Sequence, residues 1–141
     1  MTTVNADNYT KSLDPTPASN ELDPGVWGAK VRCQFDVYEA SAAADGTLIR
    51  IAKVPKGAYL LDVMVAHDDL GSLCVLAVQT EGGSAEEIHA DSDVHTAASM
   101  FHGVKVDFFG KKMTADTVIV LEVETAAITG TIHTATLYCL Q

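Results

Sequence analysis

Apolar residues that alternate with polar ones are the feature of this sequence that most constrains its fold. The first such run spans residues 30–38. Its apolar members are Val31, Cys33, Phe35 and Val37, and its polar members are Lys30, Arg32, Gln34 and Asp36. A period of two is that of a β-strand, whose successive side chains point to opposite faces. We therefore expect a half-buried strand whose polar side chains lie on a face in contact with water.

Short apolar runs of this kind recur along the chain at intervals of roughly ten residues. We expect further strands at 47–54, 58–67, 72–80, 87–90, 104–109, 117–124 and 131–140. Between the first two of these, Val54-Pro55-Lys56-Gly57 has proline at the second position of a tight turn and glycine at the fourth, which predicts a hairpin. Seven to eight short strands with this spacing are typical of an all-β, jelly-roll-like β-sandwich.

One short helix is expected over residues 91–100. Ser92 or Asp93 can cap its first turn, because their side-chain oxygens accept hydrogen bonds from free backbone amides. The apolar residues that follow recur at helical spacing; they are Val94, Ala97, Ala98 and Phe101. A helix of two to three turns is too short to be stable alone, so we expect it to pack on the sandwich.

The first 27 residues differ in composition from the remainder of the chain. They contain three of its four prolines, which disfavour both helix and central strand. We predict an extended N-terminal arm at 1–27 and a β-sandwich domain at 28–141. The arm residues expected to contact a partner are Tyr9, Leu13, Pro15, Pro17, Leu22 and Trp27. Two alternatives are that the arm is a frayed tail and that Trp27 caps the sandwich core.

The charge of the chain disfavours binding to nucleic acid and to anionic membranes. The chain has nine Lys and Arg residues and nineteen Asp and Glu residues, which gives a formal net charge of -10. No apolar run approaches the roughly 18 residues of a membrane helix. The three cysteines cannot all pair within one chain, and we interpret them as buried apolar residues of a protein assembled in a reducing cytoplasm.

The sequence contains no catalytic signature, and we expect neither an enzyme nor a cofactor. No GxSxG or HExxH motif occurs. Asp91-Ser92-Asp93 opens like a calcium loop, but Thr96 stands where that loop requires glycine. His89, His95 and His102 are spaced six and seven residues apart, so we interpret them as solvated loop residues and not as a metal site. A metal site shared between subunits of a trimer is the alternative.

The segment DGTLIRIAKVPKGA at 45–58 resembles a recurring stretch of structural proteins of tailed bacteriophages. Further parts of the chain are similar to the same family; they lie at 14–17, 25–28, 63–71, 114–120, 129–132 and 137–138. The resemblance implies a virion protein, and specifically a capsid decoration (cement) protein on the outer capsid surface. It further implies binding to the major capsid protein and a homo-oligomer, a trimer. The alternative is a fibre or tail-associated β-sandwich that binds carbohydrate or a receptor.

Overall fold

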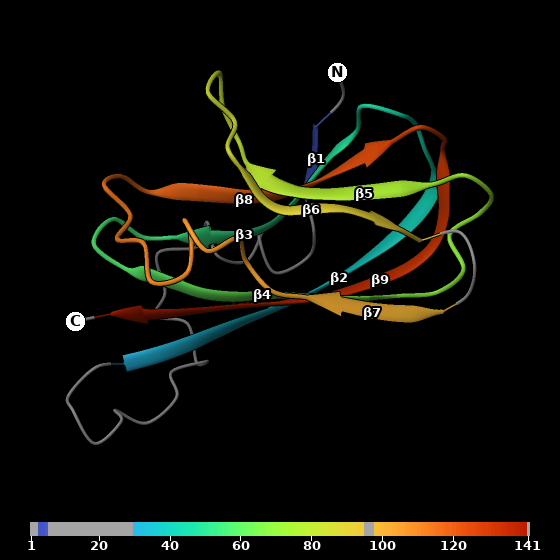
Figure 1. Ribbon diagram of the computed structural model, residues 1–141. Helices are drawn as coiled ribbons and strands as arrows, with labels where there is room; N and C mark the ends of the chain where they lie inside the picture. The colour runs from blue at the N-terminus through green and yellow to red at the C-terminus, as the bar shows by residue number, and fades with distance from the viewer. Residues whose placement is uncertain (1–2, 6–29, 95–97, 141) are drawn as a thin grey trace.

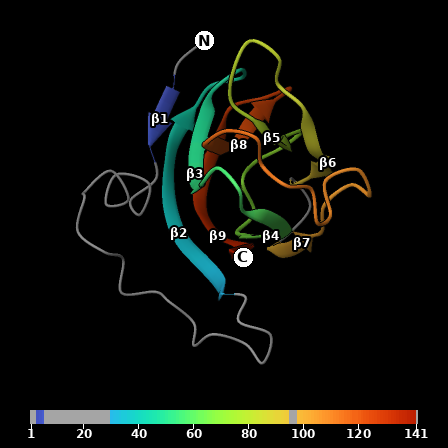
Figure 2. The same cartoon turned by 90° about the vertical axis from the view of Figure 1, so that its left-hand side faces the viewer.

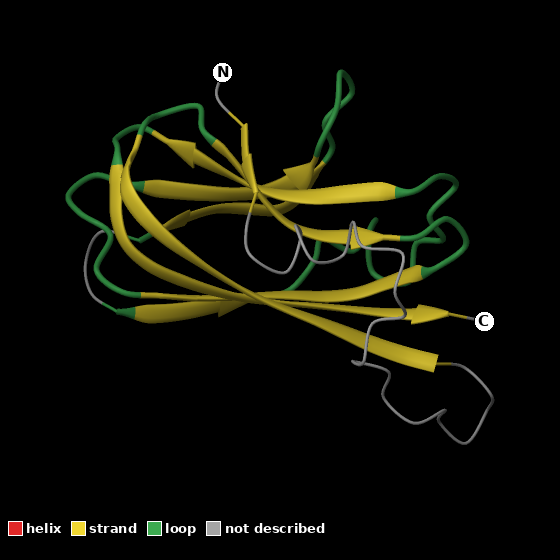
Figure 3. Cartoon of the chain, turned by 180° about the vertical axis from the view of Figure 1, so that it is seen from behind, coloured by secondary structure: helices red, strands yellow, loops and turns green. Residues whose placement is uncertain are grey.

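The computed structural model of the chain describes residues 3–5, 30–94 and 98–140, and these form two β-sheets packed face to face (Figure 1). The strands are β1 (Thr3–Asn5), β2 (Lys30–Ala43), β3 (Leu48–Val54), β4 (Tyr59–His67), β5 (Val75–Thr80), β6 (Glu87–Asp93), β7 (Ser99–His102), β8 (Thr117–Glu124) and β9 (Ile128–Leu140). Among the described residues there is no helix, and Figure 3 shows strands and loops alone.

The order of the strands confirms the predicted jelly-roll sandwich. One sheet has the order β1-β3-β8-β5-β6 and the other β2-β9-β4-β7. Four antiparallel pairs, β2 with β9, β3 with β8, β4 with β7 and β5 with β6, nest inside one another. They form a long hairpin that is rolled up so that its strands are shared between two sheets, which is the arrangement of a jelly roll. Strand β1 is an addition at the edge of the first sheet.

The predicted hairpin between β3 and β4 is wrong, because the two strands lie in different sheets. The turn between them is displaced by one residue from its predicted position. Its hydrogen bond joins the Ala58 amide to the Pro55 carbonyl at 3.1 Å, which places Gly57 third in the turn. Gly57 has a φ of 89°, a conformation that a type II turn requires at its third position and that glycine adopts without strain.

The predicted helix at 91–100 is also wrong. Residues 91–93 belong to β6, where Ser92 and Asp93 pair with β5, whereas 99–102 form β7 and pair with β4 in the other sheet. Residues 95–97 lie outside the described residues. Aspartate, serine and histidine are weak helix formers, and pairing with two existing strands satisfies the backbone groups without a helix.

The strand predicted at 104–109 is a loop of consecutive turns. The amides of Phe108 and Phe109 both donate to the Lys105 carbonyl, at 2.8 and 3.1 Å. The two ends of this loop are fixed to different sheets. The Lys105 amide donates to Ile88 of β6 at 2.7 Å, and the Gly110 amide donates to Leu60 of β4 at 2.8 Å.

The core lies between the two sheets. The side chains of β2 point to the opposite faces from those that the sequence predicted. Strand β9 directs Ile132 and Tyr138 into the core, with 0 % and 4 % of their surface exposed. Residues opposite each other in an antiparallel pair share a face, and Tyr38 is opposite Ile132. The even-numbered residues of β2 therefore point inward and bury Asp36. Phe35, expected inside, points outward.

Candidate interaction surfaces

The outward side of the sheet β2-β9-β4-β7 is mainly apolar, and we call it the outer sheet face. The strand registers place ten apolar side chains on it: Val31, Cys33, Phe35, Val37, Met64, Ala66, Met100, Ala135, Leu137 and Cys139. Three of them are well exposed, with 61 % of Phe35, 55 % of Met100 and 38 % of Val37 accessible to solvent. Contiguous exposed apolar surface on a small domain marks a site of association.

Charged groups on the outer sheet face are few. Asp62 and His102 form a pair in which His102 Nδ1 and Asp62 Oδ2 are 3.7 Å apart. Glu39 accepts a hydrogen bond of 2.9 Å from the Thr131 hydroxyl near one end of β2. Between these groups, the row from Phe35 across Ala135 to Met64 carries no charge. An apolar partner surface can therefore contact this row without desolvating an ion.

The loop from Val104 to Gly110 forms a second apolar projection. Val106 and Phe109 expose 90 % and 67 % of their surface, although Phe108 between them in sequence is buried. The Lys111 ammonium lies 4.3 Å from the centre of the Phe108 ring and forms an ion pair with Glu86 at 2.7 Å. Hydrogen bonds to both sheets fix the backbone of this loop, from which the two exposed apolar side chains project.

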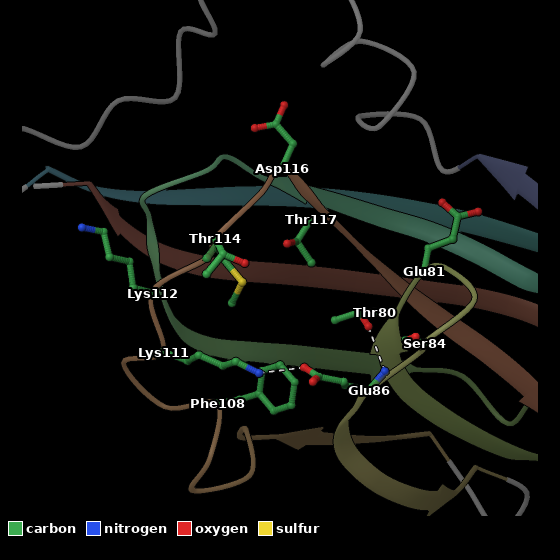
Figure 4. Close-up of a pocket in the computed structure, with 11 residues that line it drawn as sticks. Thr80, Glu81, Ser84, Glu86, Phe108, Lys111, Lys112, Thr114, Asp116 and Thr117 are labelled. Carbon is green, nitrogen blue, oxygen red and sulfur yellow. Dashed lines mark hydrogen bonds and ion pairs between the residues drawn. The ribbon is translucent and has the colours of Figure 1, made fainter.

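A shallow groove of roughly 380 Å³ lies beside this loop (Figure 4). Its lining is polar, with hydroxyls from Thr80, Ser84, Thr114 and Thr117. The aromatic ring in its wall belongs to Phe108, which is buried and covered by the Lys111 ammonium. A sugar ring stacks on an exposed aromatic face, and the groove offers none among the described residues. This geometry does not favour the carbohydrate-binding alternative at this groove.

The four histidines among the described residues occupy strands and not the loops that we expected. His67 in β4 is buried, and its Nδ1 lies 2.7 Å from the Asp68 carbonyl oxygen. His89 in β6 packs against Phe101 of β7 with ring centres 5.1 Å apart, so it joins the two sheets. No group of three potential metal ligands occurs among the described residues, and His95 lies outside them.

Burial lowers the pKa of His89 below its ordinary value. The neighbouring charges divide in sign. Glu87 and Asp62 favour the protonated imidazole, whereas His102 and Lys105 disfavour it.

The prediction that the cysteines are buried holds for Cys33 and Cys74, and burial raises the pKa of both thiols. Cys139 is partly exposed.

The partner-contact residues predicted in the arm cannot be compared with the structure. Tyr9, Leu13, Pro15, Pro17, Leu22 and Trp27 all lie outside the described residues. The surfaces that the structure does describe were not predicted. One sequence signal pointed to the outer sheet face. In β2, apolar residues occur at odd-numbered positions, such as Phe35 and Val37, and also at the even-numbered positions of Tyr38 and Ala40, so both faces of the strand are partly apolar. A strand that is apolar on both faces needs a partner on each side.

Three solved structures of phage capsids contain chains with this fold. A chain in the capsid of Ralstonia phage GP4 aligns with a TM-score of 0.67 and 17 % identity, over 99 % of this chain and 98 % of that one. A chain in the acidic stable capsid structure of Helicobacter pylori bacteriophage KHP30 aligns with a TM-score of 0.59 and 14 % identity, over 78 % and 87 %. A chain in the cyanophage Pam1 capsid asymmetric unit gives 0.58 and 19 %, over 91 % of each chain.

The predicted resemblance to phage structural proteins is thus confirmed at the level of the fold. No family model and no curated protein matches the sequence. Among the described residues, no helix is long and apolar enough to cross a membrane.

Proposed function

We propose that the chain is a structural protein of a bacteriophage virion, with no catalytic role. The observation that carries this proposal is the alignment with a chain of the Ralstonia phage GP4 capsid, which extends over nearly the whole length of both chains. The two chains therefore share one fold over nearly the whole length that was compared. Function is not fixed by fold alone, so the proposal also needs support from surfaces.

Within the virion, we propose a decoration (cement) protein on the outer surface of the capsid lattice. The net charge of -10 supports this location, because an acidic protein is repelled by packaged DNA on the inner side. The outer sheet face supports association with other protein subunits. The partners that we propose are the major capsid protein and further copies of this chain, arranged as a trimer.

The rigidity of the sandwich suits this role. A cement protein must resist deformation while it joins neighbouring capsid subunits, and each contact can be weak because many copies act together. Paired strands and a core with fully buried residues such as Ile49, Leu121 and Ile132 provide such a body. In this proposal the arm residues Tyr9 and Trp27 add contact area beyond the sandwich.

The experiment that tests the proposal is binding of the purified chain to capsids that lack it. The full chain is compared with a Tyr9→Ala/Trp27→Ala variant. We expect saturable binding at a fixed ratio to capsid subunits, and at least tenfold weaker binding of the variant. Equal binding of both chains would move the contact from the arm to the sandwich. Absence of binding by either would overturn the decoration role and favour the fibre or tail alternative.

A further inference from the structure

Strand β1 differs from every other strand in the described structure. It has three residues and runs parallel to its neighbour β3, whereas all other pairings are antiparallel. Thr3 is opposite Leu48, Val4 opposite Ile49 and Asn5 opposite Arg50. Figure 2 shows β1 at the left margin of the fold, and its pairing places it at the edge beside β3. The edge of β3 is therefore a docking site for a short extended segment.

The contact between β1 and the sandwich includes a side chain as well as the backbone. Val4 is partly buried and packs against the hydrophobic core, on the same side of the sheet as the fully buried Ile49. Backbone pairing alone is indifferent to sequence, but a side chain in a fixed place sets the register. The β3 edge thus recognises an apolar residue at the middle position of the short strand, which is Val4 in this chain.

The length of chain that joins β1 to β2 exceeds what a connection within one sandwich needs. Twenty-four residues, 6–29, separate Asn5 from Lys30. Connections in compact domains typically have about 4–6 residues. A chain of this length can span up to about 80 Å, whereas a compact chain of this size has a radius of gyration of roughly 14 Å. The segment is long enough to bring β1 to the β3 edge of an adjacent copy.

We propose that β1 is exchanged between copies, so that Thr3–Asn5 of one chain pairs with β3 of its neighbour. The inference rests on the proposed assembly of several copies in the virion, and it names a second copy of this chain as the partner of the β3 edge. Exchange of an identical element retains every contact of the closed form, so it costs little and links subunits. A contact of three residues is weak alone and becomes effective where copies are held close together.

The test uses two variants that each carry one new cysteine, in a Cys139→Ser background because Cys139 is partly exposed. Thr3→Cys and Leu48→Cys chains of different mass are mixed, allowed to assemble and oxidised mildly. Paired positions on adjacent strands lie within the range of Cα distances that a disulfide spans. A disulfide between positions 3 and 48 of two different chains forms only after exchange. A mixture with Lys53→Cys, further along β3, is the matched control for register.

We expect at least tenfold more interchain product, mapped by mass spectrometry, with Leu48→Cys than with Lys53→Cys. Adding Val4→Asp to the Thr3→Cys chain should remove this product, because a carboxylate cannot replace Val4 against the core. A Thr3→Cys/Leu48→Cys double variant that forms the disulfide only within one chain, both free and on capsids, would overturn the inference. Capsid binding is measured on the same samples. Binding without an interchain disulfide would contradict strand exchange but support the decoration role. An interchain disulfide without capsid binding would support strand exchange but contradict the decoration role.

Discussion

The outer faces of the two sheets have opposite chemistry. On the sheet β1-β3-β8-β5-β6, Arg50 and Glu81 form a two-point ion pair with contacts of 2.7 and 2.8 Å, and Gln79 donates a hydrogen bond to Glu122. On the sheet β2-β9-β4-β7, the corresponding positions hold Phe35 and other apolar residues of the outer sheet face. One face is mainly polar with paired charges, and the other is mainly apolar.

This difference shows how a two-layer sandwich separates solubility from association. Both sheets need apolar side chains on their inner faces, so only the outer faces are free to differ. The polar outer face carries charges that satisfy one another. The outer sheet face leaves apolar surface uncovered by the described residues, at a cost in solubility that a subunit of an assembly recovers when its partner binds.

The largest expected effect comes from making the outer sheet face polar. A Phe35→Ser/Met100→Ser variant should bind capsids at least 30-fold more weakly, since central apolar contacts are worth about 2 kcal/mol or more. Its stability in urea should change by less than about 0.5 kcal/mol, because both side chains are exposed. Leu73→Ser is the control, since Leu73 is 68 % exposed and lies outside this face. Equal binding of both variants would mean that the outer sheet face contacts nothing on the capsid.

The layer directly beneath the outer sheet face contains buried hydroxyl groups, and removing one should stabilise the protein. Thr136 is fully buried, and its Oγ1 has no hydrogen-bond partner in the described structure. Thr136→Val keeps the shape and removes the cost of burying that hydroxyl, so we expect a gain of about 1 kcal/mol in urea unfolding. Thr131→Val is the control, because the Thr131 hydroxyl bonds to Glu39. A loss of stability in Thr136→Val would show that its hydroxyl is satisfied.

A smaller effect is expected on the polar outer face. The side chains of Arg50 and Glu81 remain 30 % and 21 % exposed, so solvent screens their ion pair. Arg50→Met should lower the free energy of unfolding by about 0.5–1 kcal/mol and should leave capsid binding unchanged. The loss should shrink in 1 M salt. A loss that persists at high salt would assign the role of Arg50 to packing of its apolar stem and not to charge.

Much of the architecture follows from the sequence, because the turn signals and apolar runs are local. Strand β8 has the predicted bounds, 117–124, and the sandwich class is confirmed. The side of the sheet to which each side chain points is not determined by local sequence. Phe35 and Asp36 exchange their expected sides because β9 sets the parity of β2 from a hundred residues away in sequence, by the pairing of Ala135 with Phe35.

The candidate surfaces were harder to predict than the fold for the same reason. An apolar residue on a strand is equally consistent with a core and with an interface until its facing is known. The exposed loop residues Val106 and Phe109 were assigned to a strand, since an apolar run of this length cannot be distinguished from one by periodicity. The arm residues, from Tyr9 to Trp27, stay predictions that capsid binding can test.

The smallest effect concerns the seam where the two sheets meet, and it is a dependence on pH. Because the folded chain lowers the pKa of His89 below its ordinary value of 6.5, the unfolded chain binds a proton first as the pH falls. The free energy of unfolding should therefore be highest above pH 6.5 and decrease below it, until the pH reaches the pKa of the folded state. Burial is the main cause of the lowered pKa, and four neighbouring charges modify it: Glu87 and Asp62 raise the pKa, whereas His102 and Lys105 lower it. Urea unfolding between pH 5.5 and 7.5 should show a positive slope that His89→Gln reduces. The exposed His133 lies outside this cluster, so His133→Gln should keep the slope, and a slope equally reduced in both variants would assign it elsewhere.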